Sequence, residues 1–510
     1  MSGAGPTVAR RVLFLTHNQR HDYLKDLVAH AQRSERWRLG ILSQYDMPSY
    51  YADLDFAPED LFVLPDLGRP ADWERDPDQS ERVWPMIATC ERQTGVPIHR
   101  IVLAGERTMG RGYARRFYHW PATAILKRAL RDNSEPARMA ARLFAFIDGV
   151  LDRFRPDLIV AGQAASPDGY VLAVLAETRG IPLLINRPSK ILSGRCFWTT
   201  DRGMLNTAAE ALYAERAKAG AAPGQTARAH LERFRETPKT VAYIRRNWDL
   251  AASRTWLRRH RNLAIMAAGK AKWWLTGRKS PEPNPPFARA WEFYRTAFLA
   301  ARQRRLFATL DEAELAPMRY VLMALHKEPE LAINVQNPQW HSQQDLVAQV
   351  SANLPAGYRL LVRDHRFNEG RRPMAYLRDL AGLPGVVLIS PVDPQFKYIR
   401  NAELIVSDNG TTGWEGLIFG KRVVSVGRNY YQCVGLAEQV SDPSRLGDVF
   451  IRRLAESEVS EPEEWDRRLA LYIEAEAETT VPEDAAAHSE SIRMLAELLR
   501  PLADKAARIA

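Results

Sequence analysis

Short apolar runs alternate with longer amphipathic stretches along residues 1–207, and this alternation predicts an α/β architecture. The short apolar runs are not interrupted by polar residues, which is typical of strands that are covered on both faces. The longer stretches repeat apolar residues at helical spacing. Strands separated by helices favour a parallel sheet with right-handed crossovers. The strands predicted in this part are 11–15, 39–42, 61–64, 101–104, 158–160 and 181–185, and the predicted helices are 22–33, 135–154 and 169–178.

The alternation stops near residue 208 and returns near residue 319. In between, Ala, Arg, Glu and aromatic residues recur at helical spacing without a β pattern. The strands predicted in the second alternating part are 319–325, 358–362, 386–389, 404–406 and 423–426, and the helices are 342–353, 395–401 and a short one that ends at Gly420. We therefore expect two Rossmann-like domains (1–207 and 317–482), joined by a helical, basic linker or insertion (208–316) and followed by a C-terminal helix (483–510).

Composition places the chain among globular proteins. Its 510 residues exceed what one core accommodates, and hydrophobic residues make up 46% of them. No apolar run approaches the ~18–20 residues that span a bilayer. The three cysteines lie far apart without metal-ligand spacing, which argues against a disulfide framework. We expect a cytoplasmic protein.

The net charge of +10 is concentrated in one segment. Residues 254–279 carry eight Lys and Arg residues, no acidic residue and several tryptophans. One interpretation is a solvated helix that packs its aromatic residues on the body of the protein. The other is a peripheral contact with the anionic surface of the inner membrane. No helix-turn-helix, RNP or zinc-finger pattern is present, so we expect no nucleic-acid partner.

Polar residues follow several predicted strands of the second domain at the point where each strand ends. His326 and Glu330 follow the first strand, Arg363 and His365 the second, and the turn 408–412 a later one. The carboxyl ends of parallel strands meet at one edge, where ligands of such sheets bind. The turn is either an ordinary βα turn with a threonine N-cap or an anion seat for a nucleotide phosphate. The convergence of polar residues favours the anion seat.

Each candidate has a functional and a plain structural interpretation. Thr411 and Thr412 offer hydroxyls and helix amides to a phosphate, or one of them only caps the helix. Glu415 accepts a hydrogen bond from a ribose hydroxyl, or is an acid on the helix surface. The candidate ligand-binding residues are His326, Glu330, Arg363, His365, Asn409, Thr411, Thr412 and Glu415.

Four segments of the second domain carry a resemblance to a known family. They are LHKEPE (325–330), LLVRDHR (360–366), DNGTTGWEGLIFGKRVVSVG (408–427) and NYY (429–431). These segments are similar to the capsule polysaccharide biosynthesis family, which includes bacterial β-Kdo transferases. The paired Rossmann-like layout resembles GT-B glycosyltransferases. Weaker similarity extends to 156–184 and 189–195 in the first domain.

The resemblance implies a metal-independent glycosyltransferase without a cofactor. The first domain would face a glycan or glycolipid acceptor, and the second would bind a nucleotide-sugar donor, with CMP-Kdo as the expected donor. Two departures leave the donor open. His365 is followed by Arg366 where the family has proline, and Arg422 stands where the family has proline after Gly-Lys. Arg366 is able to pair with a phosphate or a sugar carboxylate.

A retaining double displacement requires a carboxylate at the anomeric carbon, and we expect the first domain to supply it. The candidates are Glu106, directly after a predicted strand, and Asp168, in a turn that opens a helix. No DxD pattern in a suitable strand context predicts a metal site. Two alternatives remain open: a nucleotide-sugar 2-epimerase-like enzyme, because the turn 407–416 also resembles that family, and a non-catalytic polysaccharide assembly or export protein.

Overall fold

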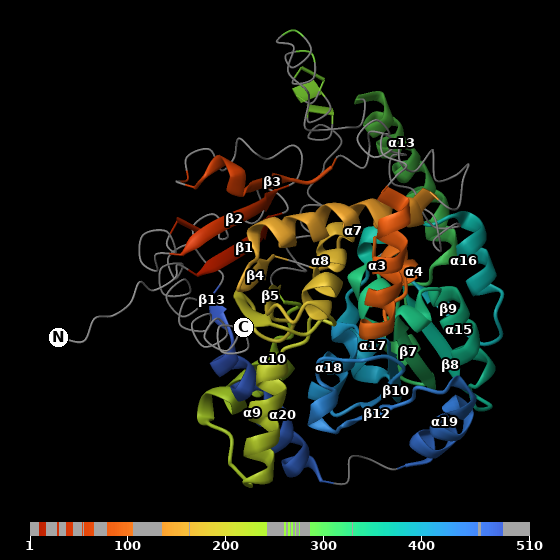
Figure 1. The fold of residues 1–510 in the computed structure, drawn as a ribbon. Coiled ribbons are helices and arrows are strands. Elements are labelled where there is room, and N and C mark those ends of the chain that lie inside the picture. The colour runs from red at the N-terminus through yellow and green to blue at the C-terminus, as the bar shows by residue number, and fades with distance from the viewer. Residues whose placement is uncertain are drawn as a thin grey trace.

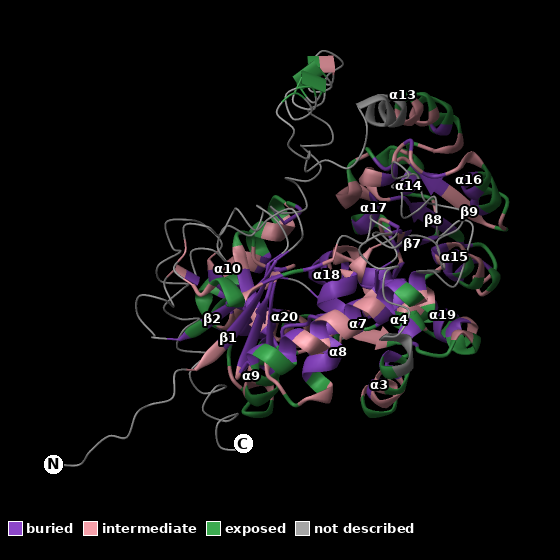
Figure 2. Ribbon diagram, turned by 45° about the horizontal axis from the view of Figure 1, so that its top comes forward, coloured by how far each residue is buried: buried purple, intermediate pink, exposed green. Residues whose placement is uncertain are grey.

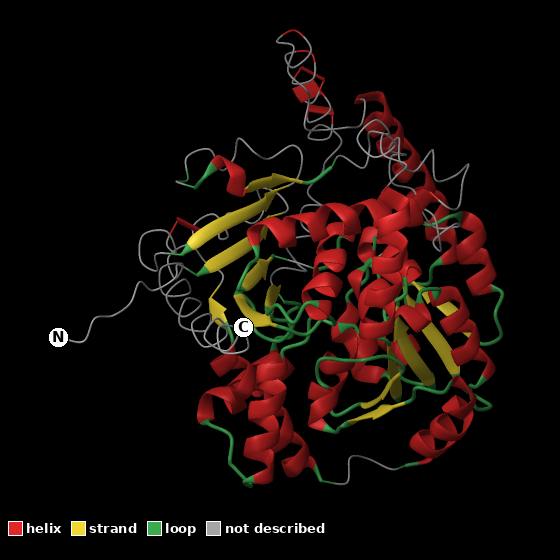
Figure 3. Ribbon diagram, in the orientation of Figure 1, coloured by secondary structure: helices red, strands yellow, loops and turns green. Residues whose placement is uncertain are grey.

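The computed structural model shows two α/β units, each built on its own sheet (Figure 1). It describes residues 10–16, 37–43, 56–65, 79–105, 135–162, 164–241, 286–328, 330–456 and 461–482, with isolated positions at 28–29, 54 and between 260 and 275. Helices surround the strands of both sheets (Figure 3), and the strands are largely buried (Figure 2).

The first sheet has seven strands in the order β13-β6-β5-β4-β1-β2-β3. Strands β1 to β5 are parallel, whereas β6 and β13 run antiparallel to their neighbours. The strands are β1 (Arg11–Thr16), β2 (Arg38–Ser43), β3 (Leu61–Val63), β4 (Leu158–Ala161), β5 (Leu183–Pro188), β6 (Arg195–Thr199) and β13 (Val481–Pro482). The predicted parallel sheet is confirmed, and β6 and β13 were not predicted.

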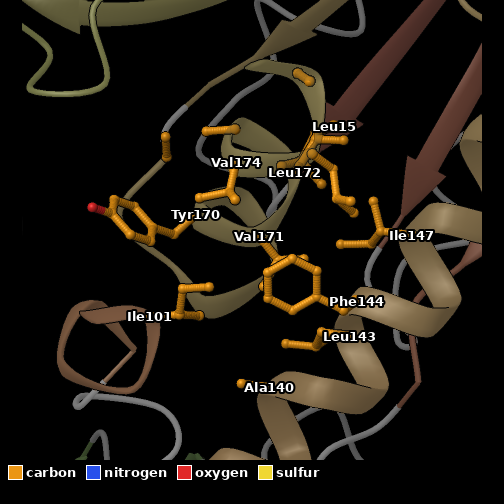
Figure 4. Packing of buried hydrophobic residues seen from close by; sticks show 14 of the residues in the cluster. Leu15, Ile101, Ala140, Leu143, Phe144, Ile147, Tyr170, Val171, Leu172 and Val174 are labelled. Atoms are coloured by element: carbon orange, nitrogen blue, oxygen red, sulfur yellow. The ribbon is translucent and has the colours of Figure 1, made fainter. Parts of the chain in front are cut away.

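Four helices pack on this sheet and on one another: α3 (Gln79–Thr94), α4 (Ile98–Ala104), α7 (Glu135–Phe154) and α8 (Pro167–Thr178). Phe144 and Ile147 of α7 meet Val171 and Leu172 of α8 in the core beneath (Figure 4). Helix α8 ends as expected, since Gly180 has φ +65° and the amide of Ile181 returns to the carbonyl of Ala176.

The strand predicted at 101–104 is wrong, because these residues form the second half of α4. Pro97 lies at the N-cap, and all four residues of the predicted strand are buried. A short apolar run buried on every side has the same pattern in a strand and in a helix, so periodicity does not separate them. Most of the predicted helix at 22–33 lies outside the described residues.

The second sheet has six parallel strands in the order β12-β11-β10-β7-β8-β9. They are β7 (Tyr320–Ala324), β8 (Arg359–Arg363), β9 (Val386–Ile389), β10 (Leu404–Ser407), β11 (Arg422–Ser425) and β12 (Ala437–Gln439). The chain starts in the middle at β7, proceeds outward to β9, and then returns to the other side of β7 as β10. This is the Rossmann order, and its topological switch point lies between β7 and β10.

Helices cover both faces of the second sheet. Val321 and Met323 of β7 face the core formed with α15 (Gln343–Ala352), α16 (Met374–Ala381) and α19 (Leu446–Ala455). Tyr320 and Leu322 face the opposite way, toward α17 (Gln395–Asn401) and α18 (Thr411–Ile418). Alternate residues of one strand therefore serve two separate cores, as expected for a strand covered on both faces.

The chain returns from the second unit to the first. Helix α20 (Pro462–Thr479) packs beside α9 (Thr207–Lys218) and α10 (Gln225–Glu236), and β13 then pairs with β6 (Figure 1). Strand β13 thus belongs to the first sheet, although it lies in the domain predicted at 317–482. The predicted domain limits stay predictions, and the predicted C-terminal helix lies outside the described residues.

The described part of the predicted linker is helical. It contains α9, α10, α13 (Pro286–Gln303) and α14 (Glu312–Leu315). Among the helices that the structure describes, none is long and apolar enough to span a bilayer. Most of the basic segment 254–279 lies outside the described residues.

Candidate functional site

The turn after β10 opens helix α18 with uncapped amides. Gly410 occupies the N-cap without a side-chain cap, and Thr411 and Thr412 are the first two helical residues. The alternative that a threonine caps the helix is therefore wrong. The hydroxyl of Thr411 instead lies close enough to Glu415, one turn later, to lower the pKa of its carboxyl. The first-turn amides and the helix dipole together favour an anion at this end.

His326 lies directly opposite this turn, across the switch point. A Cβ added to Gly410 would lie 3.7 Å from Cε1 and 4.0 Å from Nε2 of His326. The Nε2 atom is buried and makes no hydrogen bond in the structure. Burial lowers the pKa of His326 to about 4, so the ring is neutral at pH 7. A neutral imidazole presents either an acceptor or a donor at Nε2.

A buried ion network fixes the loops that follow β7 and β8. Arg372 pairs with the carboxylates of Glu328 and Asp364 and donates to the carbonyl of His326 at 2.9 Å. Asn368 donates to the same carbonyl at 3.1 Å. The network therefore holds the backbone of His326, while its imidazole stays available to the turn.

His365 and Glu330 belong to the same group of side chains. The Nδ1 atom of His365 accepts from the amide of Phe367 at 3.1 Å, and burial lowers the pKa of the ring. The carboxylate of Glu330 opposes this lowering for both His326 and His365. His365 lowers the pKa of His326 further, so the three side chains lie within electrostatic reach of one another.

Arg363, at the end of β8, and Glu415, on the buried side of α18, form a second polar group. Arg363 donates to the carbonyls of Pro391 at 2.9 Å and Asp393 at 3.1 Å, and burial lowers its pKa to about 10. Glu415 is 3% exposed and accepts from Gln395 at 2.9 Å. Burial raises the pKa of Glu415 to about 7, against the effects of Thr411 and Arg363. The interpretation of Glu415 as an acid on the helix surface is therefore wrong, and Arg363 is buried as well.

Asn409 connects the turn to the first unit through a lysine that the sequence analysis missed. Lys190, in the loop between β5 and β6, donates from Nζ to Oδ1 of Asn409 at 2.9 Å and to its carbonyl at 3.2 Å. The amide of Asn409 donates to Gln336. The weak similarity at 189–195 was the only signal in the sequence that pointed to this loop.

Asn337 is a second missed residue of the site. Its side chain is fully buried, donates to the carbonyl of Asp408 at 3.1 Å and accepts from the amide of Arg428 at 2.6 Å. It therefore joins the end of β10 to the loop after β11. Nothing in the local sequence around Asn337 distinguishes it from a surface residue.

The two carboxylate candidates are placed differently. Glu106 lies outside the described residues. Asp168 is buried in the first turn of α8, just after the N-cap Ser166 and beyond the end of β4 in the first sheet. It therefore belongs to a different sheet from the groups around Gly410. Among the described residues, no cluster of His, Cys, Asp or Glu is suited to hold a metal ion.

The sequence of the second unit also fits a known family model. Residues 284–461 match the capsule polysaccharide biosynthesis protein family. This range contains all four segments on which the resemblance was based, so the resemblance is confirmed for this part of the chain. The two Rossmann-type sheets likewise confirm the predicted fold class.

Among solved structures, the chain is similar to the beta Kdo 2,4 transferase KpsC of Thermosulfurimonas dismutans, with 12% identity, a TM-score of 0.35 and coverage of 67% of this chain and 87% of that one. It is also similar to UDP-GlcNAc 2-epimerase of Neisseria meningitidis, with 11% identity, a TM-score of 0.28 and coverage of 96% and 100%. Likeness at these scores gives no basis for transferring an activity. No curated protein matches the sequence.

Proposed function

We propose that the protein is a glycosyltransferase that uses a nucleotide-activated sugar in the biosynthesis of a capsule or other surface polysaccharide. One observation carries the proposal: His326, after β7, lies beside Gly410 of the turn after β10, across the switch point of the second sheet and within electrostatic reach of His365. That edge is where Rossmann-type sheets bind nucleotides. The match of residues 284–461 to capsule polysaccharide biosynthesis proteins supports the same assignment.

In the proposed mechanism, the residues around Gly410 hold the donor. The first-turn amides of α18 and the hydroxyl of Thr412 bind the phosphate that leaves, and preorganised dipoles of this kind stabilise its growing charge. Glu415 accepts from a ribose hydroxyl. A carboxylate from the first unit, Glu106 or Asp168, attacks the anomeric carbon while the bond to the donor phosphate breaks and the nucleotide leaves. A hydroxyl of the glycan or glycolipid then attacks the same carbon, displaces the carboxylate and loses its proton to solvent. CMP-Kdo is the proposed donor.

Thermal unfolding with CMP-, UDP- and GDP-sugars tests the donor assignment. A ligand at a hundred times its dissociation constant adds ~2.7 kcal/mol of apparent stability. We expect one nucleotide to raise the unfolding temperature of the unaltered protein. We expect Thr412→Val to reduce the shift, because it removes the hydroxyl and keeps the shape. Thr309→Val, at an exposed position, is the control and should preserve the shift. Absence of a shift with every nucleotide would remove the donor site from the proposal.

An incubation without acceptor separates the glycosyltransferase from the epimerase alternative. A transferase leaves the nucleotide sugar unchanged apart from slow hydrolysis, whereas a 2-epimerase converts it to its epimer. A non-catalytic assembly protein predicts that Thr412→Val supports polymer synthesis as well as the unaltered protein does. Capillary electrophoresis of the nucleotide sugar and polymer analysis in cells distinguish these three outcomes.

Metal independence is a further part of the proposal. We expect EDTA to leave sugar transfer unchanged, because helix amides and cationic side chains supply the charge that a divalent ion would otherwise supply. Transfer is measured before and after chelation, with added Mg²⁺ as the second arm. A loss of transfer that Mg²⁺ restores would contradict metal independence without contradicting the transferase assignment.

The proposed membrane contact through 254–279 is tested separately. The described positions Ile265 and Leu275 of this segment are 61% and 75% exposed, which leaves apolar side chains available for such a contact. We expect the protein to sediment with anionic vesicles and not with neutral ones, and to be released by salt. Equal sedimentation with both vesicle types would favour the alternative of a solvated helix.

A further inference from the structure

Lys190 reaches from the first unit into the turn that opens α18. Its ammonium donates to Oδ1 of Asn409 at 2.9 Å and to the carbonyl of Asn409 at 3.2 Å, and lies 5.0 Å from the centre of the Tyr430 ring. Asn409 directly precedes Gly410, the N-cap of α18. The ammonium therefore bonds to the residue directly before the N-cap, next to the first-turn amides to which an anion would bind.

The loop that carries Lys190 is held in place from behind. Ser189 accepts from the amides of Ile191 and Leu192 and donates to Glu476 of α20 at 3.1 Å. Arg195 donates to the hydroxyl of Thr480 at 2.7 Å. The loop is thus fixed on both sides of Lys190, and its lysine is presented to the second sheet without the freedom of a surface side chain.

The charges that face Lys190 come from three elements. Arg187 of β5 disfavours its protonated form, whereas Glu330 after β7 and Asp408 after β10 favour it. His326 also lies within electrostatic reach. Burial outweighs the two carboxylates and lowers the pKa of Lys190 to about 7. The lysine is therefore only partly charged near neutral pH, and a further anion beside it would draw in a proton.

Two polar side chains around the same turn lack hydrogen-bond partners. Both carboxylate oxygens of Asp408 are buried without a hydrogen bond, and the same holds for Nε2 of His326. Buried polar groups are normally satisfied, so unsatisfied ones at one turn point to a ligand. The uncapped helix end, the partly buried lysine and these atoms all lie around the turn 408–412.

We propose that Lys190 is a donor-binding residue, which pairs with a phosphate of the nucleotide seated on the first turn of α18. This inference rests on the proposed function and deepens it, because it makes the first unit part of the donor site. Binding of the phosphate keeps Lys190 protonated, so nucleotide binding above pH 7 takes up a proton. The nucleoside alone has no such effect.

Isothermal titration calorimetry with CMP and UDP, and with cytidine and uridine, tests the inference. Titrations at pH 8 in two buffers of different ionisation enthalpy measure proton uptake. We expect Lys190→Met to weaken nucleotide binding roughly 10- to 100-fold, to abolish proton uptake and to leave nucleoside binding unchanged. Lys190→Arg keeps its charge at every pH, so it should bind the nucleotide without proton uptake. Lys218→Met, on the exposed side of α9, should behave as the unaltered protein.

Circular dichroism and thermal unfolding verify that each variant is folded. The inference is overturned if Lys190→Met binds the nucleotide as the unaltered protein does, or if its affinity for nucleoside and nucleotide falls equally, which would indicate a structural role. Either result leaves the proposed function standing. If the unaltered protein binds no nucleotide at all, the proposed function and the inference both fall.

Discussion

Gly413 in α18 lies where the helix packs closely on Tyr431 and on the strand beneath it. A Cβ at this position would be 1.9 Å from the hydroxyl of Tyr431 and 2.9 Å from Cβ of Ser407. No real Cβ approaches other atoms so closely, and glycine is the only residue that fits without rearrangement. This close packing of α18 on β10 seats the start of the helix at the sheet edge, beside the strand-end residues.

Gly413→Ala is therefore expected to destabilise the protein by about 1–3 kcal/mol, because the added methyl group overpacks the contact. Urea unfolding measures the change. Tyr431→Phe removes the hydroxyl nearest to the new methyl group, so the double variant should recover part of the loss. The hydroxyl of Tyr431 makes no hydrogen bond in the structure, and its removal alone should cost little.

Gly149 in α7 provides the matched control. No atom lies within 4 Å of a Cβ added there, and the residue lies inside a helix. Gly149→Ala should stabilise the protein by about 0.5–1 kcal/mol, since alanine loses less backbone freedom on folding. The prediction fails if both substitutions change stability in the same direction.

At the scale of elements, α20 is the support of the loop that carries Lys190. Glu476 of α20 is 2% exposed and accepts from the hydroxyl of Ser189 at 3.1 Å. Burial raises the pKa of Glu476 to about 7, although hydrogen bonds from Ser189 and Asn206 oppose the change. Between pH 4.5 and about 7, Glu476 is therefore protonated in the folded protein and mostly ionised in the unfolded chain.

This difference makes stability depend on pH with a definite sign. The pKa of this carboxyl is raised from 4.5 to about 7. Its contribution to the free energy of unfolding is therefore fully present below pH 4.5 and falls progressively as the pH rises to 7. Glu476→Gln removes the titrating group and keeps an acceptor for Ser189. We expect the variant to be more stable than the unaltered protein at pH 7.5 by about 3 kcal/mol at most, and little different at pH 4.5.

Urea unfolding at several pH values between 4.5 and 7.5 measures the effect. Glu415 has a pKa raised to about 7 as well, so the variant should keep part of the slope. Glu463→Gln, at the exposed start of α20, should reproduce the slope of the unaltered protein. An unchanged slope in Glu476→Gln would show that this carboxyl titrates normally.

The element pattern itself was mostly predictable from sequence. Helix α7 was predicted with its observed limits, and every strand of the second sheet except β12 was predicted within about two residues. Among the short elements, α4 was mistaken for a strand, and β6, β12 and β13 were not predicted. The helices α3, α16, α19 and α20 were not predicted individually either. Short segments contain too few periods for the pattern to select one structure, so their neighbours in the fold decide.

At the scale of the molecule, the polar contacts that join the two units beside the site include the following three between described residues. Lys190 bonds with Asn409, Gln336 donates to the carbonyl of Gly203 at 2.6 Å, and Arg428 pairs with Asp201 at 3.1 Å. The last pair is half-exposed and contributes little, because water and salt screen it. The first contact brings a residue of the first unit to the turn of the second.

Nucleotide binding at the second sheet should therefore change the mobility of the Lys190 loop in the first unit. We expect CMP or UDP to slow hydrogen exchange of the amides of Ile191 and Leu192, because a phosphate beside Lys190 steadies the loop that carries it. Exchange is followed by mass spectrometry. Asp201→Asn should preserve this protection, and Lys190→Met should remove it. Protection confined to the second sheet would contradict the coupling.

The sequence by itself determined two α/β units and the edge at which function is sought. Apolar periodicity specifies strands and helices, and parallel strands carry the residues that follow them to one common edge whatever the packing. This reasoning predicted His326, His365, Arg363 and the turn 408–412 at one edge, and the structure places His326 beside Gly410 and within electrostatic reach of His365.

Only the tertiary structure decided what surrounds that edge. It placed Lys190 on Asn409 and returned β13 to the first sheet, although both pairs of segments are distant in sequence. It also buried Glu415, which shifted the pKa of its carboxyl. Local patterns record whether a position is apolar, whereas contacts between distant segments and the loss of solvent around a charge depend on which surfaces finally meet.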